Sequence, residues 1–213
     1  MFLTAPQISE LTGWTFGRGK GANLIYRQIA VWLVLAIYVF GWWSDLEQVL
    51  SGDFMFFVDS MWVFIEKSKT DQFRDGEWVP VARCADLSLC HVAVLTSWLE
   101  FTRRSGMEPL FGIVAPYGAR GPHIRPGTVL LYTCCLEVVK IVCKELGVSN
   151  GMIGTHIARV SGASLAAEAL VSDRLFQKHG RWKSAGIKNS YVKESIKAKL
   201  SVTDAMISAI QQP

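Results

Sequence analysis

The sequence lacks paired cysteines. Its five cysteines are an odd number, and no two of them have the C-x-x-C spacing that is typical of metal or redox sites. Cys84 and Cys90 lie near His91, but no second ligand pair follows, so we expect no metal site. Unpaired thiols are typical of a reducing compartment, which indicates an intracellular protein with buried cysteines. The cysteines are Cys84, Cys90, Cys134, Cys135 and Cys143.

An uncharged run long enough to cross a membrane is also missing. The run Ile29–Trp43 has 15 residues, whereas a spanning helix needs about 18 to 20. This run therefore predicts a buried core helix. The N-terminus shows no secretory pattern. Residues 17–21, GRGKG, do not have the spacing of a phosphate-binding loop and favour a turn.

Basic residues are few at the start of the chain and concentrated near its end. Lys and Arg number 22 against 18 Asp and Glu, a net charge of +4. Residues 171–199 hold eight of these cations against two acids, a local balance of +6. Such a segment is typical of a surface that binds a nucleic-acid backbone, although a solvated helix face would have the same composition. The candidate DNA-binding residues are Arg174, Lys178, Arg181, Lys183 and Lys188.

The order of secondary-structure signals predicts a mostly α-helical domain with one small β-sheet, an α+β fold. Residues 24–50 favour a long buried helix, a turn at Gly41 and a short helix. Strand formers at 61–67 and 78–83 flank the turn residues Asp75 and Gly76, which indicates a β-hairpin. Further helices are expected at 6–12, 85–104, 128–146, 154–170, 172–180, 191–200 and 204–210, with a Pro/Gly loop at 115–127.

Four features carry chemistry. His156-x-x-Arg159 would place an imidazole and a guanidinium on one helix face. Trp182 lies nine residues before Tyr191 in HGRWKSAGIKNSYVK, and Lys69 lies on the expected hairpin in KSKTDQFRDG. The fourth feature is the excess of Lys and Arg over Asp and Glu around Tyr191. Each residue alone is more often structural, so the signal lies in their joint order and spacing.

Together these motifs resemble the tyrosine recombinase (phage integrase) family, in particular the subgroup of eukaryotic mobile elements. The resemblance covers roughly residues 24–203, which would form the catalytic domain between an N-terminal extension, 1–23, and a C-terminal helix or tail, 204–213. It implies DNA integration and DNA recombination, double-stranded DNA as partner and no cofactor. The protein would be nuclear if its host is eukaryotic.

The resemblance also implies a role for each residue. Tyr191 would attack a DNA phosphate and form a 3′-phosphotyrosyl intermediate. Arg159 and His156 would stabilise the charge that develops on the phosphate, as a planar guanidinium suits that geometry. Lys69 would protonate the leaving 5′ oxygen, and Trp182 would support the site by packing and an indole N–H hydrogen bond. His179 competes with Trp182 for its position, but the spacing favours Trp182.

One catalytic position departs from the family pattern. The family carries its first arginine after the long core helix, and Ser44 occupies that position here, while Glu47 matches the family's glutamate. Loss of one such donor typically slows cleavage about 100- to 1000-fold. Arg18 or Arg27 are candidates for a substitute. The alternative is a catalytically impaired, DNA-binding relic of the same fold.

The chain is shorter than full recombinases, which carry an N-terminal helical domain that closes around DNA. Residues 1–25 are too short for such a domain, so a partner or a missing segment would supply it. The resemblance further implies a homo-oligomer on DNA, assembled through the amphipathic C-terminal segment. A helical interaction module unrelated to DNA is the third reading; it predicts no binding to duplex DNA even at low salt.

Overall fold

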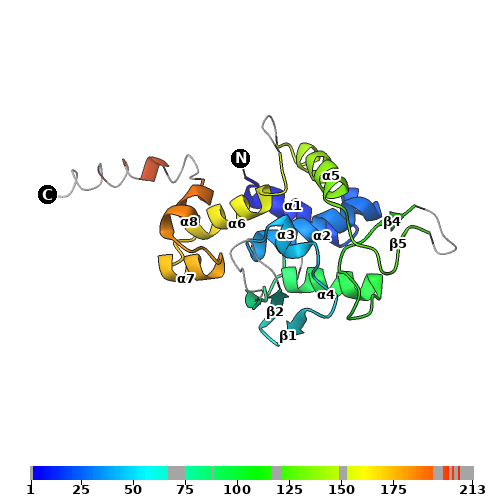
Figure 1. The fold of residues 1–213 in the computed structure, drawn as a ribbon. Helices are drawn as coiled ribbons and strands as arrows, with labels where there is room; N and C mark the ends of the chain where they lie inside the picture. The colour runs from blue at the N-terminus through cyan, green and yellow to red at the C-terminus, as the bar shows by residue number, and fades with distance from the viewer. Residues whose placement is uncertain are drawn as a thin grey trace.

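Helix α2 (Leu24–Tyr38) runs through the middle of the molecule (Figure 1). The structure is a computed structural model, and it describes residues 2–66, 75–87, 89–116, 121–148, 153–193, 199–201, 203 and 206. Asn23 caps the helix by accepting a hydrogen bond from the Ile25 backbone at 2.9 Å. Eleven of its 15 residues are buried, which confirms the expected core helix. Among the described residues, no helix is long and apolar enough to cross a membrane.

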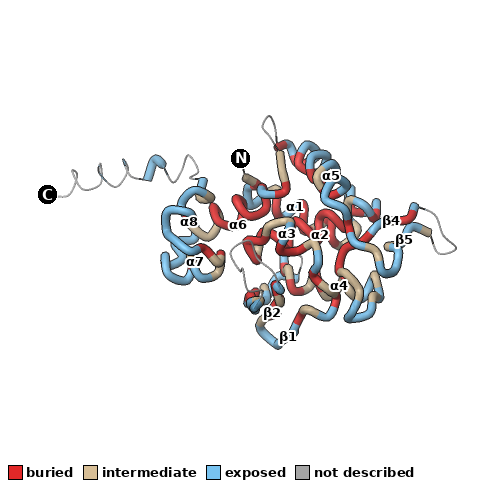
Figure 2. Tube along the Cα trace, in the orientation of Figure 1, coloured by how far each residue is buried: buried red, intermediate tan, exposed pale blue. Residues whose placement is uncertain are grey.

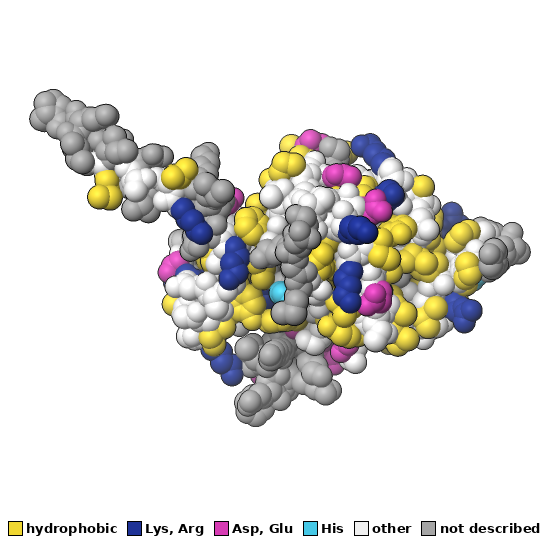
Figure 3. Space-filling model, turned by 90° about the horizontal axis from the view of Figure 1, so that it is seen from above, with side chains coloured by type: hydrophobic (Ala, Val, Ile, Leu, Met, Phe, Trp, Pro, Cys, Tyr) yellow, Lys and Arg dark blue, Asp and Glu magenta, His cyan; other side chains and the backbone are white. Residues whose placement is uncertain are grey.

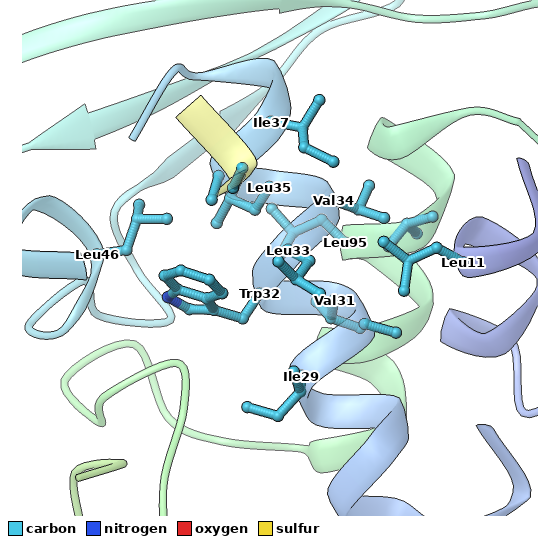
Figure 4. Packing of buried hydrophobic residues seen from close by; sticks show 14 of the residues in the cluster. Leu11, Ile29, Val31, Trp32, Leu33, Val34, Leu35, Ile37, Leu46 and Leu95 are labelled. Carbon is cyan, nitrogen blue, oxygen red and sulfur yellow. The ribbon is translucent and has the colours of Figure 1, made fainter. Parts of the chain in front are cut away.

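Three helices and a 3₁₀ turn surround α2. Helices α1 (Ala5–Thr15) and α4 (His91–Thr102) pack against it together with α5 (Tyr132–Glu145) and η1 (Gly19–Ala22). Figure 4 shows the side chains at the centre of this packing, where Leu11 of α1 and Leu95 of α4 meet residues of α2. The first 23 residues therefore share the core of the rest of the chain. Helices α4 and α5 are shorter than expected, since both begin several residues later.

A three-stranded antiparallel sheet lies beside α4 at the edge of the molecule. It consists of β1 (Phe54–Phe56), β2 (Ser60–Ile65) and β3 (Glu77–Ala82), in that order. The register of β2 on β3 confirms the expected hairpin. Strand β1 was not expected, since three residues are too few to show a period. Inside the expected Pro/Gly loop, β4 (Val114–Ala115) pairs with β5 (His123–Ile124).

The C-terminal third forms a lobe on one side of α2. It contains α6 (Ile157–Glu168), α7 (Asp173–His179) and α8 (Ala185–Tyr191), and the short α3 (Trp43–Leu46) follows the end of α2. Figure 2 shows that α6 is buried along the side that meets α2, while α7 and α8 are largely exposed. The close contact between α6 and the end of α2 requires Gly162, since a Cβ there would lie 2.6 Å from Cδ1 of Phe40.

The last helix boundary also differs from the expectation. Tyr191 ends α8 instead of beginning a helix at 191–200. Ser184 explains the earlier start, because its side chain accepts a hydrogen bond from the Ile187 backbone and so caps a helix beginning at Ala185. Val192 is extended, and residues 194–198 lie outside the described part of the chain. The overall expectation of a mostly helical fold with a small sheet is confirmed.

Candidate active site

A small hydrophobic cluster, separate from the main core, surrounds Tyr191. Its buried members are Phe40, Ala163, Phe176 and Trp182, and Tyr191 packs against them. These residues come from the end of α2, from α6, from α7 and from the segment before α8. We call this group the Tyr191 cluster. The end of α2 and three segments of the C-terminal lobe therefore meet beside Tyr191.

Arg159 is buried inside the Tyr191 cluster with only 4% of its surface exposed. One terminal nitrogen donates to the Phe40 carbonyl and the other to the Gly180 carbonyl at 2.6 Å. Burial lowers the pKa of its guanidinium to about 10, and the neighbouring charge of Arg181 acts in the same direction, while Asp45 and Tyr191 oppose it. The group therefore remains a cation at neutral pH, held at the centre of the site.

Three successive carbonyls at the end of α2 receive nitrogen donors from the C-terminal lobe. Nε2 of His179 donates to Tyr38 at 2.7 Å, Arg181 donates to Val39 at 3.1 Å, and Arg159 donates to Phe40. The last carbonyls of a helix have no intrahelical donors and carry partial negative charge. They therefore attract the two guanidiniums and bind the lobe to α2. Burial lowers the pKa of His179, so its ring is neutral near pH 7.

Tyr191 is half-buried between two indole rings. Its ring centroid lies 5.9 Å from that of Trp182 and 5.7 Å from that of Trp42. Cζ of Arg159 lies 5.3 Å from the Tyr191 centroid and 4.7 Å from the Trp182 centroid, within the range of cation–π contacts. The structure thus brings together Tyr191, Arg159 and Trp182. The sequence reading missed Trp42, although it lies two residues before Ser44 in the same motif.

Two buried donors in the Tyr191 cluster have no acceptor among the described residues. They are Nε1 of Trp182 and Nε of Arg159. The expected indole hydrogen bond is therefore not made within this part of the chain. Buried donors without acceptors are costly, so their presence in one cluster favours an incoming ligand that carries acceptors. A phosphate group has that chemistry.

Of the other two predicted catalytic residues, His156 and Lys69, the structure describes only His156. His156 lies just before the first residue of α6 and is exposed, and its imidazole lies over Gly154, since a Cβ there would be 2.8 Å from Nδ1. It is thus one helical turn from Arg159 but faces solvent. Lys69 lies outside the described residues. Glu66, the last described residue before it, lines a small hollow with Ser44.

Ser44 is exposed on α3, and no arginine occupies its position. Arg18 is exposed at the other end of α2, beside η1. Arg27 lies in the first turn of α2, where it donates to the Thr15 carbonyl at 2.7 Å and stacks 4.2 Å from the Phe101 centroid. Neither of the expected substitutes is therefore near the Tyr191 cluster. Arg181 of the C-terminal lobe pairs at 3.1 Å with Asp45, the residue that follows Ser44.

The five candidate DNA-binding cations divide into two groups. Arg174, Lys178 and Lys183 are exposed. Lys188 is buried, with its ammonium 2.5 Å from Asp173 and 5.2 Å from the Phe176 centroid, and the Arg181 side chain is only 5% exposed. Lys188 thus makes its contacts inside the lobe and Arg181 contacts the end of α2 and α3, unlike the surface role expected for them. On the face in Figure 3, Lys and Arg side chains are spread among hydrophobic and acidic ones.

An apolar groove of about 940 Å³ is lined by β3, the end of α2 and helices α6 and α7. Trp78 and Pro80 of β3 form one wall, and Leu165 and Leu175 contribute to the opposite wall. Strand β3 is at the edge of its sheet, since it pairs only with β2 in the described structure. The groove is thus bounded by an open strand edge and two helices.

Neither a family model nor a curated protein matches the sequence. Solved structures do match the fold. A XerH site-specific recombinase bound to palindromic difH in a post-cleavage complex aligns with a TM-score of 0.68 at 15% identity, over 97% of this chain and 52% of that one. A lambda integrase dimer on a COC′ core site aligns with a TM-score of 0.58 at 19% identity, over 90% of this chain and 47% of that one.

A transposon integrase also matches. The Tn1549 integrase in complex with circular intermediate DNA aligns with a TM-score of 0.55 at 11% identity, over 95% of this chain and 64% of that one. This chain therefore spans between about half and two thirds of the length of these three proteins. At such identities, the likeness shows a shared fold.

Proposed function

This chain has the fold of a tyrosine recombinase catalytic domain, and from that premise we propose that it binds double-stranded DNA and cleaves and rejoins its strands through Tyr191. The observation that carries the proposal is that Tyr191 lies against Arg159 and Trp182, each of which has a buried donor without an acceptor in the described part of the chain. A scissile phosphate supplies acceptor oxygens for those donors. The activity belongs to DNA recombination or DNA integration, as in a mobile element.

The proposed reaction has two transesterification steps. Tyr191 gives its phenol proton to solvent and attacks the phosphorus as the phenolate, the bond to the 5′ oxygen breaks, and a 3′-phosphotyrosyl bond forms. Lys69 gives a proton to the departing 5′ oxygen. A 5′ hydroxyl of a second strand then gives its proton to the now neutral Lys69, attacks the phosphorus and releases Tyr191, so the phosphodiester is restored without an energy-supplying cofactor.

Arg159 would serve this reaction by electrostatics. Its carbonyl contacts fix the guanidinium beside the Tyr191 ring before DNA arrives. A fixed cation in a buried site stabilises charge on the phosphate oxygens more than a solvated one, because no reorganisation is needed. It also favours the phenolate form of a nearby tyrosine. His156 lies one turn from Arg159 and faces solvent, and in the proposed reaction it would turn to the same phosphate.

A covalent adduct tests the proposal. The protein is incubated with a duplex that carries a nick near the cleavage position, so that the short product diffuses away and the adduct accumulates. We expect a shifted band on a denaturing gel that disappears in Tyr191→Phe. Tyr132→Phe is the matched control, because Tyr132 also contacts a tryptophan of this region, Trp43, but lies outside the Tyr191 cluster. A shifted band that persists in Tyr191→Phe would contradict the proposal.

A second candidate is the impaired relic, and Ser44 favours it. A relic would bind duplex DNA in a salt-sensitive way and form no adduct. Restoring the missing charge by Ser44→Arg would then increase cleavage about 100- to 1000-fold. An unmodified chain that already cleaves at a robust rate excludes this candidate.

We further propose that the C-terminal segment supports assembly on DNA. Leu200 and Met206 are 54% and 60% exposed, as expected for apolar side chains that a partner surface covers in an assembly. The apolar groove between β3 and α6–α7 is our candidate acceptor on a second copy. Truncation after Leu200 should abolish higher-order complexes on DNA in a native gel while single-copy binding persists. Unchanged assembly would contradict this role.

A further inference from the structure

We propose that Arg181 supplies the second phosphate-binding guanidinium that position 44 lacks. The inference rests on the proposed function, because it concerns the phosphate held beside Tyr191. A phosphodiester that becomes pentavalent carries negative charge on two non-bridging oxygens. One guanidinium can bind one or both of them, but a second fixed cation stabilises the extra charge of the transition state further.

Arg181 reaches the segment in which the arginine is missing. It comes from the turn between α7 and α8, yet one terminal nitrogen donates to the Val39 carbonyl and the other to Oδ2 of Asp45, each at 3.1 Å. Asp45 directly follows Ser44 and also accepts the Trp42 backbone N–H at 3.0 Å. The Arg181 guanidinium therefore lies against the backbone that carries position 44.

The two guanidiniums lie next to each other. Arg181 and Arg159 bind successive carbonyls, those of Val39 and Phe40. Arg181 is close enough to lower the pKa of Arg159, and Asp45 partly offsets the repulsion. Two cations and one carboxylate in a buried place leave an excess of positive charge beside Tyr191. An arriving phosphate compensates that charge.

The backbone at Arg181 supports a specific role. Its φ is +54°, a left-handed conformation that L residues other than Gly, Asn and Asp rarely adopt. Glycine would avoid the strain but could make neither the ion pair with Asp45 nor the hydrogen bond to Val39. Such strained residues concentrate at binding and catalytic sites, where the surrounding contacts hold them in place. Here the Asp45 ion pair and the Val39 hydrogen bond provide those contacts.

Phosphate binding requires one contact of Arg181 to be exchanged. The Val39 carbonyl is a neutral acceptor, whereas a phosphate oxygen is charged and forms the stronger hydrogen bond with a guanidinium. We expect the phosphate to replace the carbonyl while the Asp45 pair persists. Asp45 then acts as a positioning residue that keeps the Arg181 guanidinium directed at the phosphate.

Four proteins test this assignment: the unmodified chain, Arg181→Gly, Ser44→Arg and the double variant. Glycine suits the backbone conformation, so Arg181→Gly removes the guanidinium without adding strain. Each protein is assayed for adduct formation on the nicked duplex and for duplex affinity across a salt series. Arg103→Gly is the matched control, because Arg103 is an exposed arginine with φ +49° at the end of α4.

Arg181→Gly should slow adduct formation about 100-fold or more, as expected when a charged transition-state donor is lost. The slope of log affinity against log salt concentration should decrease in magnitude by about one, which corresponds to the loss of one phosphate contact. Ser44→Arg should restore both quantities in the double variant, yet change the rate of the unmodified chain by less than about tenfold, since the second cation is already present. Arg103→Gly should leave both unchanged.

The assignment is overturned if Arg181→Gly retains rate and slope, if Ser44→Arg fails to rescue the double variant, or if Ser44→Arg alone accelerates the unmodified chain 100-fold. Failure of the proposed function gives a different result: no protein forms an adduct, while the salt slope still reports the phosphate contact. If thermal unfolding shows that Arg181→Gly is not folded, Arg181→Lys replaces it. Lysine should then keep the salt slope but lose most of the rate, because it lacks the planar fork.

Discussion

The main core around α2 and the Tyr191 cluster bury their residues in different ways. The main core joins α1, α2, α4, α5 and the sheet almost entirely through aliphatic and aromatic side chains (Figure 4). The Tyr191 cluster is much smaller and contains Arg159 among its rings, with Arg181 and His179 beside it. Hydrophobic burial stabilises the first region, whereas buried charge requires partners to be tolerated. The comparison indicates that α2 provides stability at its centre and a place for chemistry at its C-terminal end.

A cavity in the main core should have the largest effect on stability. Leu33 is fully buried in α2, so Leu33→Ala should lower the free energy of unfolding by about 3–5 kcal/mol. Chemical denaturation measures the change. Leu175→Ala is the control in the C-terminal lobe, because that side chain is 54% exposed and should cost far less. Similar losses for the two variants would contradict the contrast between the regions.

Replacing the central cation should affect both stability and chemistry. Arg159→Lys keeps the charge but cannot reach the Phe40 and Gly180 carbonyls together, so stability should fall by about 2 kcal/mol. Adduct formation should fall about 100-fold. Arg27→Lys makes the same change beside the main core and should leave adduct formation unaltered. An equal loss of rate in Arg27→Lys would mean that the effect is not local.

The contact between the two regions can be tested at Gly162. A methyl group there meets the Ile37 carbonyl and the Phe40 ring, so Gly162→Ala should destabilise the protein by roughly 1–3 kcal/mol through overpacking. Gly186→Ala is the matched control, because a Cβ at that helical position meets nothing within 4 Å. It should stabilise α8 slightly, since alanine favours helix over glycine. Thermal unfolding of both variants distinguishes a crowded contact from a general intolerance of alanine.

Acid should weaken the structure through His91. Burial lowers the pKa of His91 to about 4, although its hydrogen bond to the Ala82 carbonyl opposes the shift. The folded state therefore holds the ring neutral, and stability is complete above the ordinary pKa of about 6.5. It should decline as pH falls from 6.5 toward 4, where the unfolded chain binds a proton that the folded chain does not.

Denaturant midpoints across this pH range measure the effect. His91→Gln retains a donor for Ala82 and should flatten the decline. His179 titrates in the same direction, because its pKa is also lowered by burial, so some decline should persist in the variant. A variant as pH-sensitive as the parent would show that His91 contributes nothing to the acid response.

Local signals in the sequence were enough for much of this architecture. Strand formers at 61–67 and 78–83 with the turn residues Asp75 and Gly76 identified the hairpin, and the motif spacing pointed to Arg159 and Trp182, which lie against Tyr191. The inward direction of Arg181 could not be predicted, because it depends on Val39, 142 residues away in the chain. A cation in a basic segment looks the same whether it faces solvent or a helix end. Trp42 was missed for the same reason, since its contacts with Tyr191 exist only in the folded state.

Peptide mapping of the trapped complex tests the central claim most directly. The protein is incubated with the nicked duplex, the complex is digested with protease and nuclease, and the peptides that retain a nucleotide are sequenced by mass spectrometry. The account predicts a single modified residue, Tyr191, joined to a 3′ phosphate. A nucleotide on any other residue, or DNA that is bound and never joined to the protein, would contradict it.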